Sequence, residues 1–195
     1  MNENSLFDLT LEDGYISSLS AKLTAYDGLF SILNKKISFD DFIREVLVVS
    51  MKVLPCEAGS ILELDYKHND LFFRTAIGSV ADKLKIYRIP VGVGAAGFVA
   101  QTLNPLNLTN AAENKIHLKS ISNSVGFEVK SMICAPIVIK GKLYGVIELI
   151  NRVGETQFTE EDTSILMDFT NKVSFVIENR IRLLSLEKTI RDSQK

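Results

Sequence analysis

Glu148 is the acidic residue in the otherwise apolar run Val146–Ile150, and its carboxylate requires a hydrogen-bond donor or a cation beside it. A carboxylate on an apolar central strand is costly to bury unless a donor or a cation meets it. If Glu148 points into a pocket, it can accept a hydrogen bond from an amine or hydroxyl of a ligand. If it lies on the open side of the sheet, it contacts solvent or a basic neighbour. The sequence leaves both interpretations open.

A glycine-rich run, Gly92–Gly97, has the G-x-G-x-x-G spacing of dinucleotide-binding loops. The context does not fit, because a short strand and a polar loop follow instead of a parallel strand–helix–strand crossover. Two uses of the run remain. The amides of Ala95, Ala96 and Gly97 can bind an anionic or carbonyl group of a smaller ligand. The glycines can instead permit close packing of a helix on the sheet.

The chain contains two cysteines and two histidines. Cys134 lies in an apolar alternating segment, where a buried cysteine behaves as a small, inert hydrophobic residue. No histidine is spaced to activate Cys134 or Cys56, and we expect His68 and His117 to be solvated. No group of residues has the spacing of metal ligands. We therefore expect no metal, no cofactor and no catalytic activity.

Composition excludes several classes of partner. The 195 residues include 22 basic and 24 acidic ones, and these are interspersed, so no basic face for a nucleic acid is expected. The start of the chain lacks the pattern of a signal peptide. The most apolar windows, Val46–Leu54 and Met132–Ile139, are shorter than the roughly 20 residues that cross a bilayer. These features predict one cytoplasmic domain without a membrane or nucleic-acid partner.

Two helices are expected before the first strand. From about Leu6 to Leu33 apolar residues recur with a period close to 3.6, which predicts an amphipathic helix. Ser38 then suits an N-cap, because acidic residues follow it and apolar residues recur on one face until Pro55. A second helix should therefore end at that proline.

Strand patterns begin after the second helix. Alternating residues on both sides of a polar turn predict a hairpin of Gly59–Asp65 with Leu71–Ile77. Four segments are then expected along the chain: an extended piece at Lys85–Val91, a short helix opened by Gly94, a short strand at Leu106–Thr109, and a long surface loop at Asn110–Glu128 with a helical turn.

The clearest strand pair is Ser131–Ile139 with Leu143–Asn151, joined by a tight turn that contains Gly141. Both strands are mostly apolar, so we place them at the centre of the sheet. Thr159 should cap a last helix, Glu160–Arg191, of about 45 Å. Tight turns between strands, with helices at both ends, predict an α+β fold with an antiparallel sheet and helices on one face.

Five segments of the sequence together resemble a GAF domain, in the branch found in cyclic-nucleotide phosphodiesterases and adenylyl cyclases. The segments are Gly59-Ser60, Ile89-Pro90 with Gly94–Ala100, Ser131–Ile137, Gly145–Asn151 and Phe158–Asp162. The resemblance covers about residues 39–179. It implies a central antiparallel sheet of about six strands, with the terminal helices packed on one face and a ligand lid on the other.

The resemblance also implies a ligand site. Its members would be Ser60, Ala76, Ala95, Ala96, Gly97, Val125, Val129 and Glu148. Val125 and Val129 stand where cyclic-nucleotide binders of the family have threonines that contact the nucleotide. A valine side chain donates no hydrogen bond. The family therefore implies a small-molecule ligand, with a cyclic nucleotide as one candidate, and leaves the identity of that ligand open.

A structural clamp between the last strand and the last helix is a second implied feature. The matching positions are Asn151, Arg152, Phe158 and Asp162, and Thr163 stands where the branch has a glutamate. Arg152 and Asp162 can form a charge-assisted hydrogen bond across this junction. We expect the clamp to fix the last helix to the sheet.

Residues 1–37 are expected to be a helical extension, 38–180 the GAF-like domain, and 181–195 an extension of the last helix. The apolar stripe through Ile181, Leu184 and Ile190 suggests dimerisation through the terminal helices. The favoured function is a small-molecule sensor. The alternatives are an interaction module with a collapsed pocket and, less favoured, a free methionine sulfoxide reductase, which needs a reactive thiol.

Overall fold

The computed structural model describes residues 23–24, 26–109, 119–155 and 157–193. Within these residues, one antiparallel sheet has the strand order β3-β2-β1-β6-β5-β4. The strands are β1 (Cys56–Asp65), β2 (Asp70–Ile77), β3 (Arg88–Pro90), β4 (Leu106–Leu108), β5 (Met132–Ile139) and β6 (Lys142–Arg152). The predicted α+β fold with a six-stranded antiparallel sheet is thereby confirmed.

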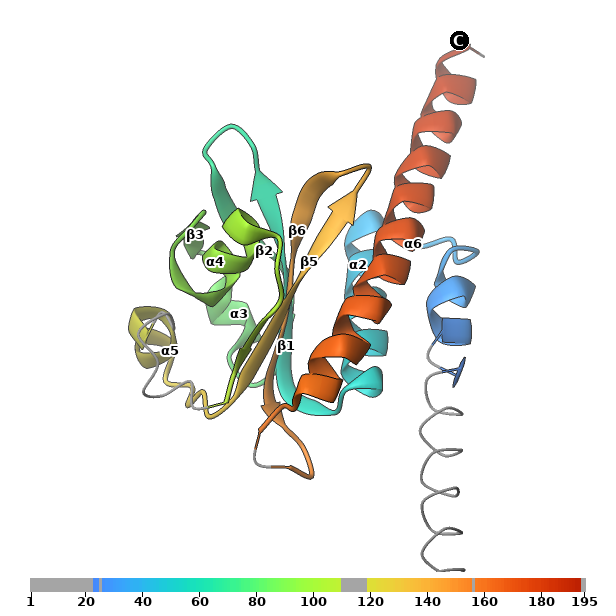
Figure 1. The fold of residues 1–195 in the computed structure, drawn as a ribbon. Coiled ribbons are helices and arrows are strands. Elements are labelled where there is room, and N and C mark those ends of the chain that lie inside the picture. The colour runs from blue at the N-terminus through green and yellow to red at the C-terminus, as the bar shows by residue number, and fades with distance from the viewer. Residues whose placement is uncertain (1–22, 25, 110–118, 156, 194–195) are drawn as a thin grey trace, which may run out of the picture.

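Helices cover both faces of this sheet. They are α2 (Phe39–Val53), α3 (Ala81–Leu84), α4 (Gly94–Thr102), α5 (Lys119–Val125) and α6 (Glu160–Ser193). In Figure 1, α2 and α6 lie on one face, and α3, α4 and α5 lie on the other. This arrangement confirms the expectation of terminal helices on one face and a lid on the opposite face.

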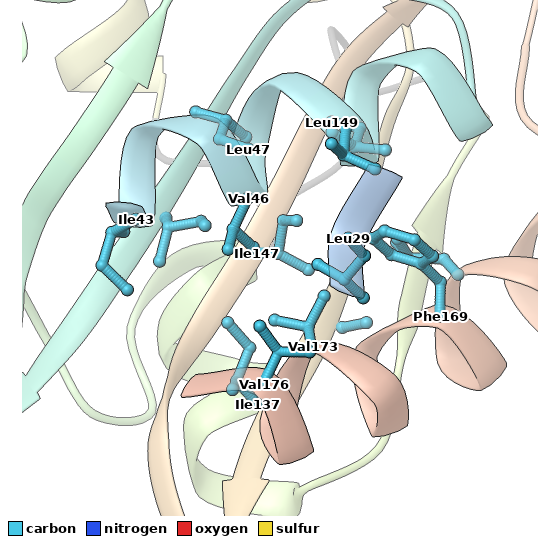
Figure 2. Packing of buried hydrophobic residues seen from close by; sticks show 14 of the residues in the cluster. Leu29, Ile43, Val46, Leu47, Ile137, Ile147, Leu149, Phe169, Val173 and Val176 are labelled. Carbon is cyan, nitrogen blue, oxygen red and sulfur yellow. The ribbon is translucent and has the colours of Figure 1, made fainter. Parts of the chain in front are cut away.

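Each face of the sheet has its own hydrophobic core. Figure 2 shows the larger core, in which Ile147 and Leu149 of β6 meet side chains of α2 and α6. Val146, the neighbour of Ile147, is buried in the second core, which also contains Ala96 and Val99 of α4. Successive side chains of a strand point to opposite faces. The period-two pattern of β6 therefore decides which residues face α2 and α6 and which face α4.

The second predicted helix is present as α2. The Ser38 side chain accepts a hydrogen bond from the backbone N–H of Asp41 at 3.0 Å, as an N-cap does. The helix ends at Leu54, next to Pro55. Of the first predicted helix, 6–33, the structure describes a helical stretch at 26–32, and Leu29 is fully buried there against the larger core. Residues 6–22 and 25 of that prediction lie outside the described residues.

Two predicted segments differ in the structure. The extended piece expected at Lys85–Val91 contains a strand only at Arg88–Pro90, and the short helix α3 precedes it. Helix α3 has four residues, too few to show a helical period in the sequence. In the predicted loop at Asn110–Glu128, residues 119–125 form helix α5, while 110–118 lie outside the described residues.

The predicted clamp residues lie together where β6 meets α6. The Nε of Arg152 is 3.4 Å from a carboxylate oxygen of Asp162. Asp162 also accepts from the backbone N–H of Thr159 at 3.0 Å, and its own N–H donates to the Thr159 hydroxyl at 3.1 Å. These reciprocal bonds are a capping box, here with an aspartate. Thr163 accepts a hydrogen bond from Asn107 of β4 at 3.3 Å, so it joins α6 to the sheet edge.

Asn151 connects three segments at the end of β6. Its side-chain oxygen accepts from the N–H of Lys130 at 2.8 Å, and its amide nitrogen donates to Glu57 of β1 at 2.7 Å. Its φ of 58° is left-handed, which asparagine tolerates better than most residues. Phe158 is fully buried in the larger core. The last strand and the start of α6 are thus fixed by hydrogen bonds and by an aromatic side chain.

Two glycines of the β5–β6 hairpin give a matched test of the sheet packing. At Gly145 a Cβ atom would overlap the carbonyl oxygen of Leu62 on β1, whereas at Gly141 no atom lies within 4 Å. We expect Gly145→Ala to lower the free energy of unfolding by about 3 kcal/mol, because the strands must separate. The control Gly141→Ala should lower the free energy of unfolding by about 1 kcal/mol, because alanine is strained in the left-handed backbone conformation of this residue. Urea unfolding measures both, and equal losses would contradict this packing.

The capping box gives a second prediction. Asp162→Ala removes the acceptor of both the Thr159 N–H and the Arg152 side chain, and should lower the free energy of unfolding by about 2 kcal/mol. The control is Glu161→Ala, which removes an exposed acid from the same turn and should cost less than about 0.5 kcal/mol. Thermal unfolding compares the two variants, and a loss at Asp162 no larger than at Glu161 would show that the box does not stabilise the junction.

Candidate functional site

A cavity of about 80 Å³ lies between the sheet and helices α3, α4 and α5. Residues of β1, β2, β5 and β6 form the floor of the cavity, and residues of the three helices form its walls. The lining residues are mostly apolar: Ala58, Gly59, Ser60, Phe73, Ile77, Gly78, Val80, Ala81, Leu84, Ile89, Ala95, Ala96, Ile121, Ser122, Val125, Phe127, Val129, Met132, Glu148 and Ile150. Helix α5 covers the side of the cavity away from α6 (Figure 1).

The structure brings together most of the residues predicted to contact a ligand. Six of them line the cavity: Ser60, Ala95, Ala96, Val125, Val129 and Glu148. Ala76 and Gly97 do not. Ala76 lines a second hollow, of about 420 Å³, between α2, β2 and α3, and its carbonyl oxygen accepts a hydrogen bond from Arg44 at 3.5 Å.

Gly97 packs against backbone rather than against the cavity. A Cβ atom at this position would overlap the Pro90 carbonyl oxygen, and the Gly97 carbonyl accepts from the Gly92 N–H at 2.8 Å. Of the two uses expected for the glycine run, close packing of helix on strand holds at Gly97. The N-terminal residues Ala95 and Ala96 of α4 are left to face the cavity.

Glu148 faces the cavity with only 6% of its surface exposed. The strand register explains its partners, because Glu148 on β6 lies opposite Ser60 on β1 and opposite Cys134 on β5. The Ser60 hydroxyl donates to Oε2 at 2.8 Å, and the Cys134 thiol lies 3.8 Å from Oε1. Neither partner carries a positive charge. The structure therefore resolves the two interpretations of Glu148 in favour of the cavity.

Burial raises the pKa of the Glu148 carboxyl, and the hydrogen bonds from Ser60 and Cys134 oppose that rise. Among the described residues that line the cavity there is no lysine, arginine or histidine. Helix α4 contributes N-terminal backbone amides at this wall, and these favour negative charge. The cavity thus contains one titratable acid that can accept a hydrogen bond in its ionised form and donate one in its protonated form.

Both cysteines lack the character of nucleophiles. Cys134 is fully buried, and burial together with the charge of Glu148 raises the pKa of its thiol well above the usual value. Burial raises the pKa of Cys56 to about 11. A reactive thiol requires a lowered pKa and access to solvent. The structure thus agrees with the expectation that Cys134 acts as a small hydrophobic residue.

Within the part of the chain that the structure describes, His68 and the potential metal ligands form no second site. His68 lies in the β1–β2 turn, where its Nδ1 is 2.6 Å from Asp65, and His117 lies outside the described residues. Hydrogen bonds from His68, opposed in part by desolvation, lower the pKa of Asp65 to about 2. Across the described residues, no three of the usual ligand side chains gather as a metal site requires. None of the described helices is long and apolar enough to cross a membrane.

Helix α5 is attached to α3 and its following loop by polar contacts. The Tyr87 and Ser124 hydroxyl oxygens are 2.7 Å apart, and Lys83 donates to the Val125 carbonyl at 3.2 Å. Partly buried Ile121 and Phe127 pack from this segment against the second core. The lid is therefore held at its rim by hydrogen bonds and over the cavity by apolar contact.

The sequence did not predict most of the apolar residues that line the cavity. Phe73, Phe127 and Met132 line the cavity but carry no polar group that would mark them as site residues. Cross-strand register could have found part of the wall, since residues paired with Glu148 lie on its face of the sheet. Helices α3 and α5, which close the cavity, are too short to be recognised from periodicity.

Comparison with known proteins gives a consistent assignment. The family model of the GAF domain matches residues 38–177. A 3',5'-cyclic phosphodiesterase of Caenorhabditis elegans is 27% identical over 141 residues, which are 68% of this chain and 19% of that protein. A dual cyclic-AMP and cyclic-GMP phosphodiesterase of Drosophila melanogaster is 25% identical over 151 residues, 71% of this chain and 10% of that protein. The chain spans less than a fifth of the length of these curated relatives.

Solved structures support the fold. The GAF domain of A. aeolicus nlh2 in an inactive state has a TM-score of 0.70 at 22% identity, and the match covers 84% of this chain and 99% of that one. A free methionine-R-sulfoxide reductase of Neisseria meningitidis has a TM-score of 0.68 at 15% identity, over 83% and 91% of the two chains. At such identities the likeness concerns the fold alone. Because the family match extends over most of the chain, from 38 to 177, this protein belongs to the GAF domain family.

Proposed function

We propose that this GAF domain is a regulatory domain that binds a small molecule in the cavity beneath α5 and does not catalyse a reaction. The observation that carries the proposal is Glu148, a buried carboxyl that faces the cavity and has no cationic side chain beside it among the described residues. Burying such a group is costly, and a ligand that bonds to it would repay that cost. Concave apolar sites with a few convergent polar groups are the usual form of small-molecule sites.

Cyclic nucleotides are one ligand class that the relatives suggest, because the name of the Drosophila melanogaster phosphodiesterase refers to cyclic AMP and cyclic GMP. The cavity also supports ligand binding over the alternative of a collapsed interaction module. Phe127 lines the space rather than filling it. The raised pKa values of Cys56 and Cys134 argue against a methionine sulfoxide reductase, although proteins with that activity share the fold.

We further propose that the domain works in the cytoplasm as a homodimer, joined through α6 beyond residue 180. Four apolar residues there are largely exposed in the single chain: Ile181, Leu183, Leu186 and Ile190. Leu183, Leu186 and Ile190 follow one another at spacings of three and four, which places them along one side of the helix. An exposed apolar stripe of this kind fits a second copy of the same helix.

A cavity-filling variant tests the ligand site. Val125→Phe places a larger side chain at the lid, and we expect it to abolish the thermal stabilisation that a bound small molecule gives the wild-type protein. A ligand at about one hundred times its Kd should raise the Tm of the wild type by about 5 °C or more. The screen would contain cyclic GMP, cyclic AMP, nucleosides, amino acids and short amines.

The control for that screen is Asn123→Ala, which changes an exposed residue of the same helix that does not line the cavity. It should respond to the same compound as the wild type. If no compound stabilises the wild type, or if Val125→Phe responds equally, the cavity is not a ligand site.

A charge substitution on α6 tests the dimer. Replacing both Leu186 and Ile190 by glutamate puts like charges into the proposed interface, and should convert the dimer to a monomer in sedimentation or light scattering at about 50 μM. Because these side chains are 60% and 57% exposed, the core should remain folded by circular dichroism. Lys188→Glu is the matched control and should remain a dimer. A monomeric wild type would refute the proposal.

A further inference from the structure

Resting on the proposed function, we infer that the cavity selects a compact ligand with a positively charged amine, and that Glu148 is the residue that sets this preference. The proposal concerns the chemical class of the ligand. It follows from the size of the space, from the charges around it and from the hydrogen bonds that Glu148 already makes.

The size of the cavity limits the ligand to a few carbon atoms. Its volume is about 80 Å³. A cavity of about 150 Å³ lined by aliphatic and aromatic side chains is known to hold benzene, so this space suits a smaller apolar group. A mononucleotide with its base, ribose and phosphate exceeds that volume several times while α5 lies over the cavity. With α5 in this position, the space therefore favours a short branched or linear chain.

The charges around the cavity favour a cation over an anion. Ionised Glu148 carries a full negative charge, while the lining residues in the described part of the chain include no lysine, arginine or histidine. The N-terminus of α4 contributes positive character through the amides near Ala95 and Ala96, but a helix terminus carries only roughly half a unit of charge. An anion held at those amides would share the cavity with Glu148 at short range, where like charges repel strongly.

The existing hydrogen bonds leave room for one strong donor. Oε2 of Glu148 accepts from Ser60 at 2.8 Å, whereas the donor at Oε1 is the Cys134 thiol at 3.8 Å, a weak donor at long range. Each carboxylate oxygen can accept about two hydrogen bonds. An ammonium group can therefore bond to Oε1 without displacing Ser60, and a charge-assisted bond is about twice as strong as a neutral one.

The affinity for an amine should rise with pH. Burial raises the pKa of Glu148, and an ammonium group binds the ionised carboxylate. Affinity should therefore fall as the pH drops below that pKa and level off above it. The groups that face Glu148 do not obscure this titration, because Ser60 on β1 is neutral and burial keeps the Cys134 thiol on β5 protonated. From α3, Lys83 donates a hydrogen bond to the Val125 carbonyl of the lid.

Three compounds with the same branched carbon skeleton test the inference: isobutylamine, isobutanol and isovalerate. Each is titrated into the full chain, and the amide signals of the cavity wall are followed by ¹H–¹⁵N NMR. We expect isobutylamine to bind about tenfold more tightly than isobutanol, and isovalerate to give no saturable shift. In Glu148→Gln, which keeps the shape and the bond to Ser60, amine affinity should fall about tenfold and lose its pH dependence, while isobutanol changes less than threefold.

The matched control is Glu63→Gln, which alters a carboxylate of β1 that bonds to Tyr144 instead of lining the cavity. It should bind isobutylamine as the wild type does. Tight binding of isovalerate or cyclic GMP at these wall residues, or an unchanged amine affinity in Glu148→Gln, would overturn the inference and leave the proposed ligand site standing. Absence of shifts with these compounds, when another compound of the thermal screen binds, would also overturn it. Failure of every compound in both experiments would remove the proposed function itself.

Discussion

The alternation of side chains along β6 is the constraint on which the rest of the structure depends. Ile147 and Leu149 point into the core beneath α2 and α6, so Val146 and Glu148 must point to the opposite face. A shift of register by one residue would place the carboxyl in the larger core and isoleucine and leucine in the cavity. The packing that stabilises one face thereby determines the chemistry of the other.

The same register provides Glu148 with its neighbours. Pairing of β6 with β1 and with β5 puts Ser60 and Cys134 on either side of the carboxyl, although these residues lie 88 and 14 positions away in the sequence. Neither neighbour neutralises a charge. The burial of Glu148 is offset in part by the hydrogen bond from Ser60, and burial also raises the pKa of its carboxyl, which favours the neutral form.

The sheet also separates the proposed ligand site from the proposed dimer interface. The cavity is lined by residues of α3, α4 and α5. Helix α6, which carries exposed apolar residues beyond residue 180, lies on the other face of the sheet (Figure 1). Both depend on β5 and β6, because these strands form the floor of the cavity and α6 packs across β5. A ligand that displaced those strands would act on the helix through direct contact, without an intervening segment.

The sequence alone determined the features that depend on local pattern. Periodicity and capping identified α2, α6 and the β5–β6 hairpin, because Ser38, Pro55, Gly141 and Thr159 mark their ends. Glu148 was recognisable as an acid in an apolar strand. The tertiary structure decided on which face Glu148 lies, which apolar side chains surround it, and that Gly97 packs against Pro90. These depend on strand register and on the approach of distant segments, and no pattern within a single segment records either.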